Sequence, residues 1–182
     1  RPDGARLLDA LTRRLREASP LALAFSGGLD SRFLAHMAAR LAKDGVRAWL
    51  FHIQGPHVPA AESAEASAWA REHGLGLTLI DLDPLRIPQV RTNDMLRCYH
   101  CKRYLFMALR EAALAHPAFA GETPVLCDGS NLSDRDSYRP GLRALEELGV
   151  RSPLAEVGLT KEAIRGLAAQ TGLDRPDQQA RP

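Results

Sequence analysis

The sequence has no hydrophobic run that approaches the roughly 20 residues needed to span a bilayer. It also lacks an opening basic stretch followed by an apolar core, which is the pattern of a secretory signal. The 24 Lys and Arg residues nearly balance the 22 Asp and Glu residues, so the basic excess typical of nucleic-acid-binding surfaces is missing. These absences predict a cytoplasmic protein with neither a membrane span nor a nucleic-acid partner.

Cysteine is scarce, with only Cys98, Cys101 and Cys127. An odd number without an export signal argues against a disulfide framework and favours thiol or metal chemistry in a reducing compartment. Hydrophobic residues make up 45% of the 182 positions, enough to bury one core and too many for a disordered chain. We expect one domain over residues 1–175. Because the chain has no initiator methionine, we expect a longer protein, in which residues 176–182 begin a segment leading to a further C-terminal part.

Short apolar runs alternate with stretches of helical periodicity along the chain. Strands are predicted at 21–25, 46–53, 75–82 and 124–128, with a short fifth strand at 152–154. Helices are predicted at 5–17, 33–43, 60–73, 102–115, 141–148 and 161–170. Because parallel neighbours need a crossover connection, this order predicts an α/β fold, a doubly wound parallel sheet with helices on both faces. The polar, proline-containing stretch from Pro84 to Asn93 is predicted to be a loop that covers a site.

The strongest local pattern is SGGLDS at residues 26–31, directly between the first predicted strand and the helix that follows. Two glycines allow a tight turn and a close approach of backbone NH groups to an anion, and the helix start offers unpaired NH groups. The loop lacks the lysine of the GxxxxGKS/T phosphate loop and does not match the dinucleotide pattern GxGxxG. We predict a phosphate site of another class, with a plain turn that caps a helix as the alternative.

A second polar cluster, DGSN at residues 128–131, follows the fourth predicted strand. It is expected at the same carboxyl edge of the sheet as residues 26–31, where ligands of open α/β sheets bind. Residues 134–141 add two carboxylates and two guanidinium groups, from Asp134, Asp136, Arg135 and Arg139. Carboxylates can hold magnesium and arginine can bind phosphate, although a solvated charged loop explains this run equally well by itself.

SGGLDS resembles the PP-loop of the ATP pyrophosphatases, enzymes that split ATP into AMP and pyrophosphate to adenylate a substrate. The whole set of motifs resembles the LarE branch of that family, also called ExsB-related, the ATP-dependent sacrificial sulfur transferases. The motifs fall in the family order and cover nearly the whole chain: SGGLDS, DGSN, DSYRPG, RSPLAEVGLTKEAIRGLA and RPDQQARP. The resemblance implies adenylation of a carboxylated pyridinium mononucleotide and then sulfur insertion, in biosynthesis of the nickel-pincer cofactor.

The resemblance also implies ATP and Mg²⁺ as cofactors and assigns roles to individual residues. The expected nucleotide-binding residues are Ser26, Gly27, Gly28, Asp30, Ser31, His52, Asp128, Gly129, Lys161 and Arg165. The expected catalytic residues are Asp30, Tyr138, Arg139 and Glu156. Within these sets, Asp30 would orient magnesium or the loop, and His52 would lie near the adenine. Lys161 is also compatible with a surface lysine on a solvated helix face.

Cys98 and Cys101 form a CxxC pair at a predicted helix start, where amide ends and basic neighbours favour thiolates. From the pattern alone it fits half a zinc site, a dithiol, part of an iron–sulfur site, or two ordinary thiols. The resemblance favours two of three cysteine ligands of a 4Fe-4S cluster, with the third beyond Pro182 and Cys127 as a core residue. Cys127 as the third ligand is the alternative. In the family, the sulfur source is a cysteine shortly after the segment matching RPDQQARP.

Two further functions remain open at this stage. A tRNA-thiolating enzyme with a PP-loop belongs to the same chemical class and would need a basic RNA-binding extension, which this chain does not show. A non-catalytic module that senses nucleotide and binds structural zinc is a rival of another class. For the enzyme, the resemblance also implies assembly into a homo-oligomer.

Overall fold

The computed structural model describes residues 2–92, 95–136 and 139–179. Within these, four parallel strands form one sheet: β1 (Leu21–Ala24), β2 (Ala48–Gln54), β3 (Leu77–Asp81) and β4 (Val125–Cys127). Their spatial order is β3-β2-β1-β4, and Leu21 of β1 is in register with Ala48 on one side and Val125 on the other. The expected parallel α/β sheet is confirmed.

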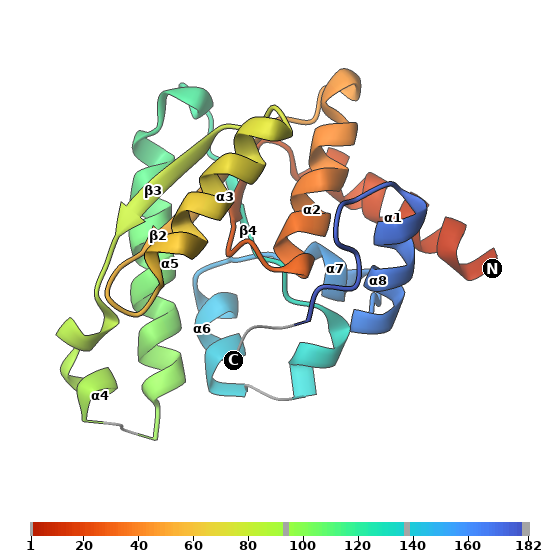
Figure 1. The fold of residues 1–182 in the computed structure, drawn as a ribbon. Helices are drawn as coiled ribbons and strands as arrows, with labels where there is room; N and C mark the ends of the chain where they lie inside the picture. The colour runs from red at the N-terminus through yellow and green to blue at the C-terminus, as the bar shows by residue number, and fades with distance from the viewer. Residues whose placement is uncertain (1, 93–94, 137–138, 180–182) are drawn as a thin grey trace.

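Helices connect and cover the strands (Figure 1). The α-helices are α1 (Pro2–Ala18), α2 (Leu29–Arg40), α3 (Ala60–Glu72), α4 (Pro88–Arg91), α5 (Arg97–Ala115), α6 (Arg139–Glu147), α7 (Pro153–Glu156) and α8 (Lys161–Gln170). Short 3₁₀ turns are η1 (Ala42–Asp44), η2 (Pro84–Arg86), η3 (Pro117–Phe119) and η4 (Leu132–Asp136). No helix in the described part of the chain is both long and apolar enough to cross a membrane.

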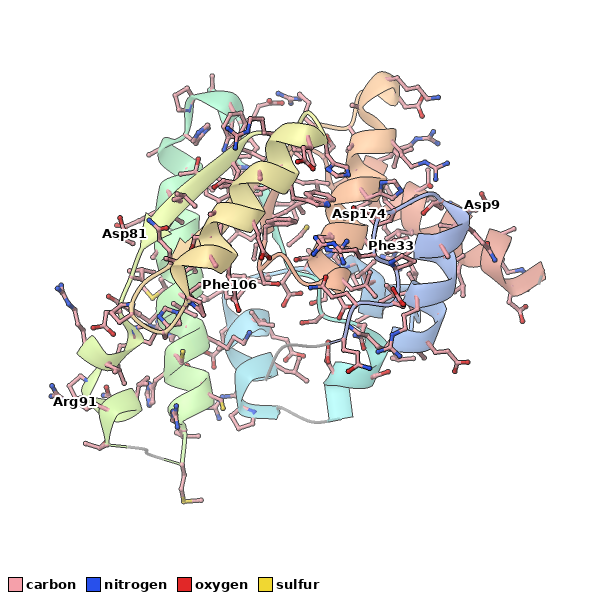
Figure 2. All side chains as sticks on the ribbon, viewed as in Figure 1. Asp9, Phe33, Asp81, Arg91, Phe106 and Asp174 are labelled. Atoms are coloured by element: carbon pink, nitrogen blue, oxygen red, sulfur yellow. The ribbon has the colours of Figure 1, made fainter. Side chains whose placement is uncertain are left out.

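The core has two parts, one on each face of the sheet. Alternate residues of a strand point to opposite faces, and accordingly Leu21 and Leu23 of β1 join one cluster while Ala22 joins the other. The first cluster is built with α1, α2, α3 and α8, and includes Phe33 (Figure 2). The second is built with α5 and α6, and includes Phe106. Helices therefore cover both faces, as predicted.

Two predicted elements differ from the structure. Residues 152–154 are not a strand: Arg151 makes an isolated parallel bridge with Cys127, and α7 begins at Pro153. Proline cannot donate a backbone hydrogen bond to a ladder but is well suited to the first turn of a helix. The stretch after Pro84 is not a plain loop, because it contains η2 and α4, both of which begin at a proline. Asn93 lies outside the described residues.

Candidate functional site

The site lies where the order of the strands reverses. From β1 the chain adds β2 and then β3 on one side, whereas β4 lies on the other side of β1. In open α/β sheets, the carboxyl ends of the strands at such a switch point are the usual place for a ligand. Residues 26–31 follow β1 and residues 128–131 follow β4, so both polar segments emerge at this point.

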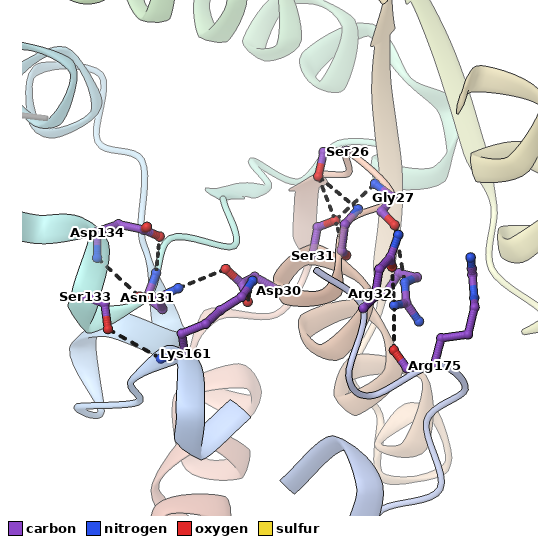
Figure 3. A network of polar contacts seen from close by, with 12 residues as sticks. Ser26, Gly27, Asp30, Ser31, Arg32, Asn131, Ser133, Asp134, Lys161 and Arg175 are labelled. Carbon is purple, nitrogen blue, oxygen red and sulfur yellow. Dashed lines mark hydrogen bonds and ion pairs between the residues drawn. The ribbon is translucent and has the colours of Figure 1, made fainter. Parts of the chain in front are cut away.

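The loop at residues 26–31 is closed by its own hydroxyl groups (Figure 3). The Ser26 Oγ and Ser31 Oγ atoms are 3.1 Å apart, and Ser31 Oγ accepts a hydrogen bond of 3.2 Å from the Gly27 amide. Gly27 has a φ of +89°, which favours glycine. Gly28 is the N-cap of α2 and no side chain caps this helix, so the orphan NH groups of its first turn are available for an anion.

Gly129 brings the segment after β4 directly against this loop. A Cβ atom at Gly129 would lie 2.9 Å from the Ser31 nitrogen and 3.1 Å from the Ser31 Cα. Such contacts are too short for any other residue, so the absence of a side chain permits the two backbones to meet. Next to Gly129, the buried Asp128 carboxylate accepts hydrogen bonds from the hydroxyl groups of Ser130, at 2.7 Å, and Ser152, at 2.6 Å.

Asp30 connects three parts of the chain that are distant in sequence (Figure 3). Its Oδ1 accepts a hydrogen bond of 2.8 Å from Lys161 Nζ, and its Oδ2 accepts one of 2.9 Å from Asn131 Nδ2. Asn131 is itself held by Asp134 through reciprocal bonds to the backbone. Lys161 therefore reaches the loop from the start of α8.

Two cavities share the Asp30 region. The first, of about 370 Å³, is lined by the ends of β1 and β2, the 26–31 loop, Gly129 and the apolar side chains of Ile53, Val58 and Phe106. The second, of about 250 Å³, is lined by Ser26, Gly28, Lys161, Gln178 and Gln179, among others. The apolar side chains of the first cavity suit a ring, and the lysine of the second suits an anionic group. We refer to them as the ring cavity and the phosphate cavity.

A third cavity, of about 680 Å³, contains the cysteine pair. Cys98 and Cys101 lie in the first turns of α5, and both line this cysteine cavity together with Arg97. Lys102, Ser130 and Asp134 line both the cysteine cavity and the ring cavity, so the two adjoin each other. This arrangement brings two thiol groups next to the candidate nucleotide site.

The turn that carries the cysteine pair is anchored to α6. The Tyr99 hydroxyl donates a hydrogen bond to the Glu147 carboxylate, and the Arg143 guanidinium lies 4.4 Å from the centre of the Tyr99 ring. Burial raises the pKa of the Cys101 thiol, and the nearby Lys102 charge only partly offsets it. The expected preference for the thiolate is therefore wrong for Cys101, because desolvation dominates over the basic neighbours.

Cys127 is separated from the pair by the sheet. It is fully buried in the core cluster of α1, α2 and α8, whereas α5 packs on the other face. Burial raises its pKa to about 12, with the Asp128 charge adding to the effect. Cys127 is therefore a core residue and not a third ligand beside Cys98. Among the described residues, no group of three His, Cys, Asp or Glu side chains is placed to hold a metal ion.

The remaining predicted site residues lie as follows. His52 is at the wall of the ring cavity, but both of its ring nitrogens are bonded, to the Phe25 carbonyl at 2.8 Å and to the Ser63 hydroxyl at 3.0 Å. Glu156 accepts bonds of 2.9 and 2.6 Å from Arg151, and it lines none of these cavities. Arg165 is exposed on α8 and also lines none of them.

Two predicted catalytic residues cannot be placed in this arrangement. Tyr138 lies outside the described residues, and Arg139 begins α6 with a side chain that is not described. Sequence reasoning missed Lys102, Glu62 and Arg32. Lys102 lies between two cavities and Glu62 lines both the ring and the phosphate cavities. Arg32 directly follows the glycine loop and is buried, and a charged residue inside an otherwise apolar helix face was the available signal.

The sequence is similar to one family model and to proteins from other organisms. The family model described as asparagine synthase matches residues 4–100. An uncharacterised protein of Synechocystis is 33% identical over 96% of this chain and 63% of its own length. The pyridinium-3,5-bisthiocarboxylic acid mononucleotide synthase of Lactiplantibacillus plantarum is 32% identical over 90% of this chain and 57% of its own. The chain thus spans about three fifths of the length of these relatives.

Solved structures show the same fold at low identity. The NMN synthetase of Francisella tularensis superposes with a TM-score of 0.67, at 16% identity, over 97% of this chain and 73% of that one. The U34-tRNA thiolase of Methanococcus maripaludis, solved with its 4Fe-4S cluster, superposes with a TM-score of 0.62, at 17% identity, over 94% and 65%. At these identities the likeness establishes the fold alone.

Proposed function

The chain belongs to the asparagine synthase family of PP-loop enzymes, and from this premise we propose that it uses ATP to adenylate a carboxylate and then admits sulfur. The proposed substrate is a carboxylated pyridinium mononucleotide, and the proposed pathway is nickel-pincer cofactor biosynthesis. Support for the substrate comes from the Lactiplantibacillus relative, whose name contains a bisthiocarboxylic acid mononucleotide. The homo-oligomer and the cytoplasmic location stay predictions.

The observation that carries the proposal is the meeting of three features at one edge of the sheet. The glycine loop and the start of α2 present amide groups, and Lys161 adds a positive charge in the phosphate cavity. The ring cavity adjoins the loop, and the cysteine cavity adjoins the ring cavity. A nucleotide bound across the first two would place its reacting phosphate close to the entrance of the third.

The proposed chemistry uses these features in two steps. A carboxylate oxygen of the substrate attacks the α-phosphorus of ATP, the bond to the β-phosphate oxygen breaks, and pyrophosphate leaves with the electron pair. In this proposal, the NH groups of α2 and the Lys161 ammonium would stabilise the charge on pyrophosphate. A sulfur nucleophile then attacks the acyl carbon, and AMP leaves with the electron pair of the acyl–oxygen bond. Hydrosulfide gives the thiocarboxylate directly, whereas a cysteine thiolate gives a thioester, from which β-elimination removes the Cα proton and breaks the Cβ–S bond to release the thiocarboxylate. Adenylation is needed because an oxide anion is a poor leaving group.

Magnesium fits the residues of the site. Asp30 and Asp128 supply carboxylate oxygens at the edge of the ring cavity, and Mg²⁺ in nucleotide sites is usually held by one or two carboxylates together with substrate phosphates. Bound there, the metal would neutralise phosphate charge. Asp30 is already oriented by Lys161 and Asn131, so the chain's own contribution is to hold that carboxylate in position.

A 4Fe-4S cluster does not fit the described residues by themselves, because Cys98 and Cys101 supply two sulfur ligands and Cys127 faces the other core. We keep the cluster as a proposal that needs a third sulfur ligand from outside the described residues, and we derive no step through it. We expect anaerobically prepared full-length protein to lose bound iron on Cys98→Ser or Cys101→Ser and to keep it on Cys127→Ala. Retention of iron by the first two variants would exclude the pair as ligands, and zinc in place of iron would favour a structural site.

The test of function is release of AMP and pyrophosphate by the full-length protein under anaerobic conditions, with Mg²⁺ and ATP. Release that depends on the carboxylated pyridinium mononucleotide is the expected result. Release that depends on tRNA instead would identify an RNA-thiolating enzyme. If AMP forms under neither condition, the enzyme proposal is wrong and a nucleotide-binding module remains.

A further inference from the structure

Arg32 is a buried cation directly behind the glycine loop. It lies in the first turn of α2, and only 1% of its surface is exposed. Its Nε donates a hydrogen bond of 3.2 Å to the Gly27 carbonyl, which lies inside the loop. A buried charge is costly unless it is paired and hydrogen-bonded. The partners of the remaining guanidinium nitrogens therefore show which part of the chain offsets this cost.

Three acceptors of the Arg32 Nη1 and Nη2 donors belong to residues 174–178, which we call the return segment. Figure 3 shows the contact with Arg175. The guanidinium donates to the Asp174 carbonyl at 2.6 Å, to the Arg175 carbonyl at 3.1 Å, and to Oε1 of Gln178. One side chain therefore joins the glycine loop to a segment about 140 residues later in the chain.

Other contacts hold the same segment and its approach in place. The Trp69 indole nitrogen donates a hydrogen bond of 2.9 Å to the Asp174 carboxylate. His36 and Arg40 of α2 both contact the Thr171 carbonyl, at 3.1 and 3.4 Å. The return segment is thus attached to α2 and α3 at several points before it reaches the phosphate cavity.

The chemistry of arginine fixes the orientation of the Gln178 amide. A guanidinium has donors and no acceptor, so the atom of Gln178 that faces Arg32 must be the oxygen. The amide nitrogen, with its two NH donors, then points away from Arg32. Gln178 lines the phosphate cavity together with Ser26, Gly28 and Lys161. Within the described residues, no acceptor receives a hydrogen bond from the Gln178 side-chain nitrogen.

From this geometry we infer that Gln178 is a ligand of the pyrophosphate portion of ATP, donating from its side-chain nitrogen, and that Arg32 is its positioning residue. The inference rests on the proposed function, in which the phosphates of ATP occupy the phosphate cavity. It adds a donor from the C-terminal part of the chain to those of the loop and α8. It also gives a functional reason for the burial of the charged Arg32 side chain, which apolar packing does not require.

The experiment measures equilibrium binding of ATP, pyrophosphate and AMP, each with Mg²⁺, to the full-length protein and its variants. Gln178→Leu keeps the approximate size of the side chain and removes the donor. We expect it to weaken pyrophosphate and ATP about tenfold, the scale of one hydrogen bond to a charged group, and to leave AMP unchanged. Gln170→Leu, at the exposed end of α8, is the matched control and should bind all three ligands normally.

The positioning role is tested with Arg32→Met and with the double variant. Because Arg32 is inferred to act through Gln178, the double variant should bind pyrophosphate no more weakly than the worse single variant. Arg40→Met is the control, since Arg40 contacts the chain near the return segment but not the loop. If Arg32→Met does not fold, the Gln178→Leu result still decides whether Gln178 is a phosphate ligand.

Each outcome has a definite meaning. If the unchanged protein binds neither ATP nor pyrophosphate, the proposed function fails and the inference fails with it. If it binds both and Gln178→Leu binds them equally well, only the role of Gln178 is wrong. Equal weakening of AMP and pyrophosphate by Gln178→Leu would also overturn the inference, because it would indicate general damage to the site and no contact with pyrophosphate.

Discussion

Single residues decide how closely the two halves of the site approach each other. Gly129→Ala would place a Cβ atom 2.9 Å from the Ser31 backbone nitrogen, and backbone atoms yield less easily than the end of a side chain. We expect a loss of about 1–3 kcal/mol in the free energy of unfolding, together with weaker ATP binding. Urea unfolding and ATP titration measure the two effects.

The control for this prediction is Gly166→Ala in α8, where an added Cβ meets nothing within 4 Å. Because alanine favours helix over glycine, that variant should be as stable as the parent or more stable by up to about 1 kcal/mol. If Gly129→Ala behaves like Gly166→Ala, the two segments are far enough apart in solution to accept a side chain at residue 129.

Cys127 gives a pH dependence of stability. Burial raises the pKa of its thiol from 9.0 to about 12, so the native state keeps the proton at pH values where the unfolded chain releases it. The unfolded state then binds fewer protons, and stability falls as the pH rises above 9, by at most about 1.4 kcal/mol per pH unit for this group. Below pH 9 the contribution is constant.

The check is urea unfolding between pH 8 and pH 10.5 with the parent protein and Cys127→Ala. Other groups titrate equally in both proteins, so the parent should show the steeper loss, and the difference between the two curves isolates the thiol. Parallel curves would mean that Cys127 is not desolvated in solution.

At the scale of elements, the cap of α8 positions Lys161. The Thr160 hydroxyl accepts a hydrogen bond of 3.2 Å from the Ala163 amide, and Lys161 is the first residue of the helix. Thr160→Ala removes the cap and should cost about 1 kcal/mol in the free energy of unfolding, whereas Thr160→Ser keeps a hydroxyl and should cost less. Chemical unfolding ranks the three proteins, and equal stability of Thr160→Ala and the parent would show that the cap contributes nothing.

The same scale explains why some predicted elements were correct and others were not. Strands and long helices follow from local periodicity and were predicted within a few residues. Residues 151–156 were harder, because Arg151 pairs with Cys127 for one residue only and Pro153 then starts α7. Pro153 cannot donate a backbone hydrogen bond to a ladder, so the pairing does not extend into residues 152–154.

At the scale of the molecule, ATP binding should stabilise the fold by mass action. At 100 times its Kd, a ligand adds about 2.7 kcal/mol, which for a chain of this size raises Tm by about 5–11 °C. Lys161→Met removes the cation of the phosphate cavity, and a tenfold weaker Kd would halve the shift at the same ATP concentration. Thermal melts with and without Mg²⁺ and ATP measure this shift in Tm. The shift of each variant is taken relative to its own Tm without ligand.

Lys43→Met, an exposed substitution in η1, is the matched control and should show the full shift. No shift in the parent protein at saturating ATP would contradict nucleotide binding itself. An undiminished shift in Lys161→Met would assign Lys161 only the role of holding Asp30.

The sequence by itself determined the features that depend on near neighbours in the chain: the strands, most helices, the glycine loop after β1 and the polar segment after β4. It also indicated Lys161, because a helix start is locally recognisable. Only the tertiary structure decided which candidates meet. Strand register turns Cys127 into the core away from Cys98, and packing of α8 and the return segment brings Lys161 and Gln178 to the loop. Such contacts join residues more than 100 positions apart, and the direction of each side chain depends on the packing of whole elements, which local periodicity does not encode.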